Sequence, residues 1–80
     1  MTTIHDYRGY VFSISALPGE TTFLVDFPDI PDIITSGDSL AEAFAHACEA
    51  LDLHLETLQQ LGIAMPPPKH RLVLQANGRE

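Results

Sequence analysis

The chain has 80 residues, a mass of 8.8 kDa and a net charge of −7, from 11 acidic and 4 basic residues. This length allows residues 1–80 to form a single domain with one thin core, and so small a core favours self-association. The acidic balance argues against nucleic-acid binding by this chain alone and favours a basic partner. One cysteine, Cys48, excludes an internal disulfide.

The N-terminus has no basic segment followed by an apolar one, and no apolar run is long enough to cross a bilayer. We therefore expect no signal peptide, no membrane contact and a cytoplasmic location.

The first part of the chain has the pattern of antiparallel strands. Tyr7–Ala16 alternates apolar and polar residues, which predicts a half-buried strand. Leu17–Glu20 contains the Pro-Gly pair of a turn, and the β-branched and aromatic run Thr22–Phe27 then predicts the second strand of a hairpin. Two prolines make Pro28–Asp32 irregular, and Ile33–Ser36 predicts a short third strand.

A helix is predicted from Leu40 to Leu61. Ser39 and Glu42 have the spacing of a capping box at its start, and Gly62 followed by Ile63 has the pattern of a left-handed helix end. Apolar residues at spacings of three and four define the buried stripe: Leu40, Phe44, Ala47, Leu51, Leu55, Leu58 and Leu61. Cys48 widens this stripe and is expected to be a small buried apolar side chain.

The C-terminal part begins with Pro66–Pro68, which forbids further helix. Arg71–Gln75 alternates and predicts a fourth strand. The element order is therefore β-β-β-α-β, an α+β fold in which one antiparallel-rich sheet carries one long helix on one face.

The central block, Val25–Pro68, resembles the N-terminal domain of the HicB-like antitoxins of bacterial toxin–antitoxin pairs. The matching residues, in order, are Phe27, Pro28, Asp29, Pro31, Thr35, Gly37, Asp38, Ser39, Leu40, Glu42, Ala43, Glu49, Ala50, Leu51, Gly62, Pro66 and Pro68. Asp32 stands where the family usually has glycine. The resemblance implies a partial RNase H-like fold that binds and masks a small basic HicA-like toxin, an mRNA interferase. Many members continue into a DNA-binding domain, for which the residues up to Glu80 leave no room, so we expect no direct DNA binding.

Acidic residues are the candidate toxin contacts, because carboxylates can compete with RNA phosphates for a cationic toxin surface. The candidates are Asp26, Asp29, Asp32, Asp38, Glu42 and Glu49. Two other interpretations remain open. The acids could simply keep a small protein soluble, or the aspartates could bind Mg²⁺ in a metal-dependent nuclease.

Other candidate sites are weaker, and we expect no enzyme activity, no cofactor and no metal. His46 lies between Glu42 and Glu49 on one helix face, which is typical of a solvated histidine kept protonated by acids rather than of a metal ligand. An alternative function is an orphan homo-oligomeric binding module without a toxin. A homodimer or higher oligomer is expected in either case. Pairing of sheet edges, including the last strand, and contact through Leu53 both remain open as the interface.

Overall fold

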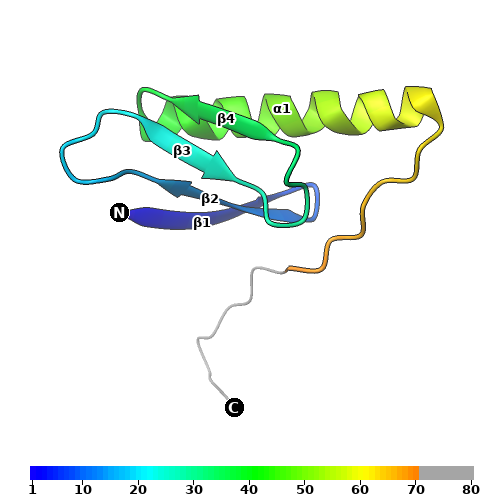
Figure 1. The fold of residues 1–80 in the computed structure, drawn as a ribbon, viewed down its shortest axis with the longest axis horizontal. Helices are drawn as coiled ribbons and strands as arrows, with labels where there is room; N and C mark the ends of the chain where they lie inside the picture. The colour runs from blue at the N-terminus through cyan, green and yellow to red at the C-terminus, as the bar shows by residue number, and fades with distance from the viewer. Residues whose placement is uncertain (71–80) are drawn as a thin grey trace, which may run out of the picture.

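A computed structural model describes residues 1–70 as a four-stranded antiparallel sheet with one long helix packed on one face (Figure 1). The elements are β1 (Thr2–Tyr7), β2 (Tyr10–Ser15), β3 (Phe23–Asp26), β4 (Ile34–Gly37) and α1 (Leu40–Leu61). The strands lie in chain order, so β1 and β4 are the two edges. The predicted α+β class, with one helix on one face of one antiparallel sheet, is confirmed.

The N-terminal hairpin was not predicted. The single strand expected over Tyr7–Ala16 is divided at Arg8 and Gly9, and Tyr7 pairs directly with Tyr10. Both turn residues have positive φ, 54° and 87°, as a two-residue hairpin turn of type I′ requires. The order of the described elements is therefore β-β-β-β-α. The strand predicted at Arg71–Gln75 lies outside the described residues.

The connections from β2 to β4 follow the predicted turn chemistry. The Glu20 N–H donates to the Leu17 carbonyl at 3.0 Å and closes the Pro-Gly turn. Two successive turns then fill the β3–β4 loop, with Ile30 N–H donating to Phe27 and Ile33 N–H donating to Ile30, each at 3.1 Å. Pro28 and Pro31 occupy the second position of these turns, where their fixed φ is favourable. The loop thereby buries two isoleucines, which are 2% and 8% exposed.

The core lies between α1 and the helix-facing side of β2 and β3. Its fully buried residues are Phe12, Ile14, Phe27, Ile30, Ala43, Ala47, Leu51 and Leu55. Phe12 and Phe27 stack with their ring centroids 4.9 Å apart. Ala47, Leu51 and Leu55 of the predicted apolar stripe supply one side of the core together with Ala43, and the strands and the β3–β4 loop supply the other. The prediction was wrong for Leu40, Phe44 and Leu61, which are exposed.

The helix has the predicted bounds, Leu40–Leu61. At its start the Ser39 hydroxyl accepts from the Glu42 N–H at 3.0 Å, while the Glu42 carboxylate accepts from the N–H of Asp38 rather than of Ser39. At its end Gly62 has φ 73°, and the N–H of Ile63 donates to the Leu58 carbonyl at 2.9 Å. These bonds satisfy groups that a helix end leaves unpaired, so both ends are fixed by the local sequence.

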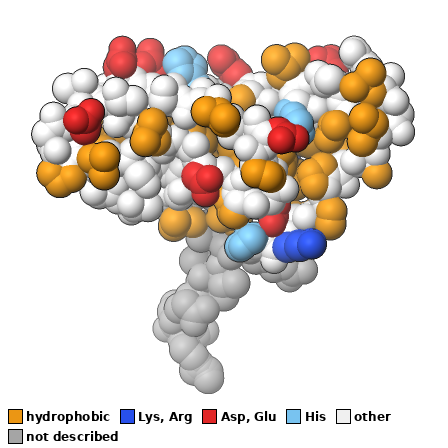
Figure 2. Space-filling view, in the orientation of Figure 1, with side chains coloured by type: hydrophobic (Ala, Val, Ile, Leu, Met, Phe, Trp, Pro, Cys, Tyr) orange, Lys and Arg blue, Asp and Glu red, His pale blue; other side chains and the backbone are white. Residues whose placement is uncertain are grey.

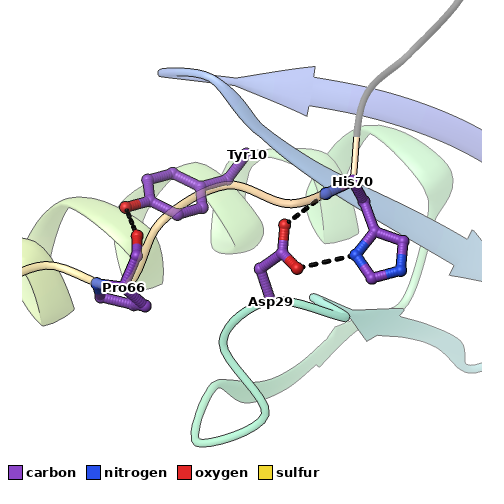
Figure 3. A network of polar contacts seen from close by, with 4 residues as sticks. All are labelled: Tyr10, Asp29, Pro66 and His70. Atoms are coloured by element: carbon purple, nitrogen blue, oxygen red, sulfur yellow. Dashed lines mark hydrogen bonds and ion pairs between the residues drawn. The ribbon is translucent and has the colours of Figure 1, made fainter.

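Residues 62–70 run from the end of α1 past the end of the sheet where β2 begins and β3 ends (Figure 1). The Tyr10 hydroxyl donates to the Pro66 carbonyl. The Asp29 carboxylate accepts from the His70 N–H at 2.9 Å and contacts the His70 Nδ1 at 2.7 Å, as Figure 3 shows. These contacts tie the segment to the sheet at two points.

Candidate partner-binding surface

The acidic side chains are unevenly distributed along the chain. Residues 9–68 contain no lysine or arginine, although nine of the eleven acids fall within this span. In Figure 2, acidic side chains are spread along the helix and over the sheet, between exposed apolar ones. The body of the fold is therefore an acidic surface with apolar patches.

A groove opens beside β4, where the strand begins next to α1. Its volume is about 300 Å³, and it is lined by Asp32, Ile33, Ile34, Ala50, Leu53, His54 and Thr57. Ile34 and Leu53 stand at its border and are 91% and 64% exposed. An apolar groove with exposed apolar borders and a charged rim is typical of a protein interaction site.

One predicted acid lines this groove, and a second pairs with one of its lining residues. Asp32 lines it from the β3–β4 loop and is exposed. Asp26 ends β3 and pairs across the sheet with Ile34, on the sheet face that the helix leaves open. Asp32 needs no glycine-like conformation here, because Arg8 is the only non-glycine residue with positive φ in residues 1–70. Asp32 therefore adds a charge beside the groove without backbone strain.

Three further predicted acids lie outside the groove, before α1 and on its exposed face. Asp38 precedes α1, and Glu42 and Glu49 lie seven residues apart on its exposed face. The Glu42 carboxylate also serves the helix cap, so its charge is held close to the start of the helix. We call the groove together with Asp26, Asp32, Asp38, Glu42 and Glu49 the β4–α1 surface.

Asp29 is placed differently from the other five predicted acids. Its side chain is only 5% exposed, and its carboxylate is occupied by the backbone and ring of His70. The His70 backbone N–H is the main reason that the pKa of Asp29 lies below its usual value, with the His70 ring helping and partial burial opposing. The Asp29 side chain thus holds residues 62–70 against the sheet, a contact that its position after a proline did not reveal.

His46 connects the helix to the edge strand. Its Nδ1 lies 2.7 Å from the Ser36 carbonyl oxygen of β4. The sequence predicted a solvated histidine, but the residue is half-buried. The Ser36 carbonyl raises the pKa of His46 most, and Glu42, Glu49 and Asp38 raise it further against the opposing effect of desolvation. The predicted influence of the flanking acids is therefore present, but a backbone bond to β4 dominates.

This arrangement predicts a pH-dependent contribution to stability. Because the folded pKa of His46 is raised above the unfolded value of 6.5, its contribution is complete below that value and is lost as pH rises through the folded pKa. We expect His46→Ala to lower Tm more at about pH 5.5 than at about pH 8.5. Glu49→Gln keeps the bond between His46 and Ser36. It should therefore reduce the pH dependence of Tm only in part. Equal losses at both pH values would contradict this assignment.

The hairpin turn is tied to the helix by a contact that the sequence did not reveal. Arg8 Nη1 lies 2.9 Å from Asp52 Oδ1, and the Tyr7 hydroxyl donates to Asp52 Oδ2 at 3.0 Å. The bond to Asp52 is the main cause of the raised pKa of Tyr7. These residues are far apart in sequence, and only the unpredicted strand β1 brings them together.

The other residues considered for chemistry are dispersed. Within residues 1–70 no group of three or more His, Cys, Asp and Glu side chains is arranged to hold a metal ion. His5 packs between Phe12 and Phe44, with ring centroids 5.3 and 5.2 Å away, whereas His70 binds Asp29. Cys48 is half-buried, and desolvation is the main cause of its raised thiol pKa. No helix in the described part of the chain is long and apolar enough to cross a membrane.

Comparison with known proteins identifies the family. The model of the HicB_like antitoxin of bacterial toxin–antitoxin systems matches residues 10–78. Neither the curated proteins nor the solved structures contain a significant match, so the RNase H-like description stays a prediction. The family match includes every element from β2 to α1, and with them the β4–α1 surface. The chain therefore belongs to the HicB-like antitoxins, the antitoxin components of bacterial toxin–antitoxin systems.

Proposed function

We propose that this chain binds a small, basic, HicA-like RNA-cleaving toxin in the cytoplasm and masks its active site through the β4–α1 surface. The observation that carries the proposal is the groove beside β4, which is lined by the exposed Ile34 and Leu53 and by Asp32, in a member of an antitoxin family. Inhibition of this kind needs no catalytic group on the antitoxin. It needs coverage of the toxin's RNA-binding surface and slow dissociation.

The apolar part of the surface would supply most of the binding energy. Ile34 and Leu53 project at the border of the groove, and apolar side chains that lose water on association contribute about 25 cal/mol per Å². Interfaces concentrate their energy in a few such central residues, surrounded by a polar rim. We therefore assign the anchoring contacts to these two residues.

The acids of the surface would increase the rate of association with the toxin and the preference for a basic partner. Asp26, Asp32, Asp38 and Glu49 are exposed, so their carboxylates can approach the cationic groups with which the toxin holds RNA phosphates. Glu42 would contribute mainly its charge, because its carboxylate also caps the helix. Asp29 would act indirectly through the overall negative potential, since its side chain is buried against His70.

Capture from the native host tests whether a toxin partner exists. Tagged chain is used as bait, and bound proteins are identified by mass spectrometry after elution with increasing salt. The proposal expects a small basic protein that cleaves RNA when purified and stops cleaving when the antitoxin is added back. Recovery of the chain alone would instead favour the orphan module.

Charge reversal then tests the surface. We expect Asp26→Lys combined with Asp32→Lys to weaken toxin binding by about tenfold or more at low salt, because two favourable contacts become repulsive. Raising NaCl from about 50 to about 500 mM should weaken toxin binding by the wild type. It should also reduce the difference in toxin affinity between the wild type and the double variant. Binding is measured by titration of the purified partner.

The matched control is Glu20→Lys, which reverses an exposed acid in the β2–β3 turn. It should leave the affinity within about a factor of two or three, since it lies outside the β4–α1 surface and is screened by salt. Glu20→Lys changes the net charge by +2 and the double variant changes it by +4. A control that loses about half as much binding free energy as the double variant would therefore show that only net charge matters and would reject the assignment of the surface.

A further inference from the structure

The edge strand β1 is long and regular and has few of the features that usually protect sheet edges. It spans six residues, Thr2–Tyr7, contains no proline or lysine and pairs with β2 without interruption. Natural edge strands are usually shortened, bent, or protected by charges, because a free edge can pair with another chain. Within residues 1–70, β1 pairs only with β2, so its other side can accept a further strand.

The opposite edge is different. In β4 the Ser36 carbonyl already accepts a bond from His46, and the strand has only four residues. Its surroundings also carry the acids of the β4–α1 surface. Two copies of so acidic a chain would repel each other strongly if they met there.

The charges favour meeting at β1 instead. β1 carries one acid, Asp6, and two positive groups lie at its opposite ends, the charged N-terminus before it and Arg8 in the turn after it. β1 and β4 are three strand spacings apart, about 14 Å, which exceeds the Debye length of about 8 Å at physiological salt. Pairing at β1 would therefore keep the acidic rims of two copies at opposite ends of a combined sheet.

The helix side of β1 has an apolar ledge that a second copy could cover. α1 packs mainly on β4 and β3, so it leaves β1 only partly covered. Phe44 contacts His5 of β1 at 5.2 Å between ring centroids, yet it remains 38% exposed, and Leu40 one turn earlier is 39% exposed. A strand pair formed at this edge would bring two such ledges next to each other.

We propose that two copies of this chain form a symmetric dimer by antiparallel pairing of their β1 strands, with Ile4 on the two-fold axis. This dimer uses a surface distinct from the proposed toxin-binding surface, and the two can be occupied together.

The side chains select this register. A two-fold axis perpendicular to the sheet must pair residues that point to the same face, which allows Ile4 or His5, among the central residues, to lie on the axis. With Ile4 on the axis, two 51%-exposed isoleucines meet on the open face, and each Thr2 hydroxyl faces the Asp6 carboxylate of the second copy. With His5 on the axis, two imidazoles would meet and Ile4 would face Asp6. The first register is the favourable one.

The test is the molar mass of the full chain in solution, measured by sedimentation at micromolar concentration and above. We expect a dimer for the wild type, and a monomer or an at least about tenfold weaker dimer for Ile4→Lys, which places two ammonium groups at the axis. Ile34→Lys is the matched control, because Ile34 is an even more exposed isoleucine on the opposite edge strand. It should leave the dimer intact.

A cross-link locates the axis independently of stability. In a Cys48→Ser background, Ile4→Cys should be joined to its copy by a short thiol-reactive cross-linker, since directly opposed strand residues have Cβ atoms about 4.5–5.5 Å apart, slightly farther than a disulfide spans. Ile34→Cys should not cross-link. A monomeric wild type, or a dimer lost with Ile34→Lys but kept with Ile4→Lys, would overturn the proposal. Efficient cross-linking at Ile34 instead of Ile4 would do the same.

Discussion

Replacing Leu51 by alanine should lower the free energy of unfolding by about 2–5 kcal/mol, the range for removing a buried leucine side chain. Leu51 is fully buried at the centre of α1, where it packs into the cluster that includes Phe12 and Ile14. A domain of this length has a total stability of about 4–12 kcal/mol. The substitution should therefore unfold a large fraction of the protein, and chemical denaturation followed by circular dichroism measures the loss.

Leu53→Ala provides the matched comparison, because Leu53 lies on the same helix but is 64% exposed. We expect a change in stability within about 0.5 kcal/mol, as for most surface substitutions. If Leu53 is an anchor of the proposed interface, its loss should instead weaken toxin binding by about tenfold. Similar destabilisation by both substitutions would show that the two helix faces are not divided between core and partner as the structure indicates.

Elements whose ends are specified locally could be predicted from the sequence. The helix is the best example, because Ser39 caps its start and Gly62 provides the left-handed residue at its end. Its apolar spacing also identified Leu51 and Leu55 as core residues. All of these signals lie within the helix or next to it, so they require no knowledge of the rest of the fold.

The N-terminal strand could not be recognised in the same way. β1 is an edge strand whose helix-facing residues, Thr3, His5 and Tyr7, are mostly polar or amphipathic and only half-buried. The apolar alternation that identifies a strand is therefore weak there. The available signal was the Arg8–Gly9 pair between two tyrosines, since glycine permits the left-handed turn of a tight hairpin.

The candidate surface was only partly predictable for a related reason. The sequence identified its acids, but the groove depends on how β4 and α1 meet, and that packing is not local. The contact between Asp29 and His70 joins residues 41 positions apart, and the bond from His46 to Ser36 joins a helix to a neighbouring strand. Sequence spacing does not encode such pairs. Only the three-dimensional structure therefore distinguishes Asp29, whose carboxylate is bound to His70, from the acids that remain accessible to a partner.

Gly37→Ala should be strongly destabilising because the end of β4 lies directly against the first turn of α1. A Cβ atom at Gly37 would collide with the Ala43 backbone nitrogen, and it would lie 2.7 Å from the Ala43 Cα and 2.9 Å from the Glu42 carbonyl carbon. Overpacking of this kind costs about 1–3 kcal/mol or more. The lower chain entropy of unfolded alanine returns only about 0.4–1 kcal/mol. The net effect is therefore a loss of stability, measurable as a lower denaturation midpoint.

Two further variants separate this clash from other causes. Asp38→Ala changes the next residue, which is exposed, and should cost no more than about 1 kcal/mol through the helix dipole. Ala43→Gly combined with Gly37→Ala should not restore stability, because the atoms in the way belong to the backbone and remain after the side chain is removed. A rescue in the double variant would mean that the strand and the helix can move apart at little cost. Glycine at position 37 would then not be required by the close approach that fixes β4, and with it the groove, against α1.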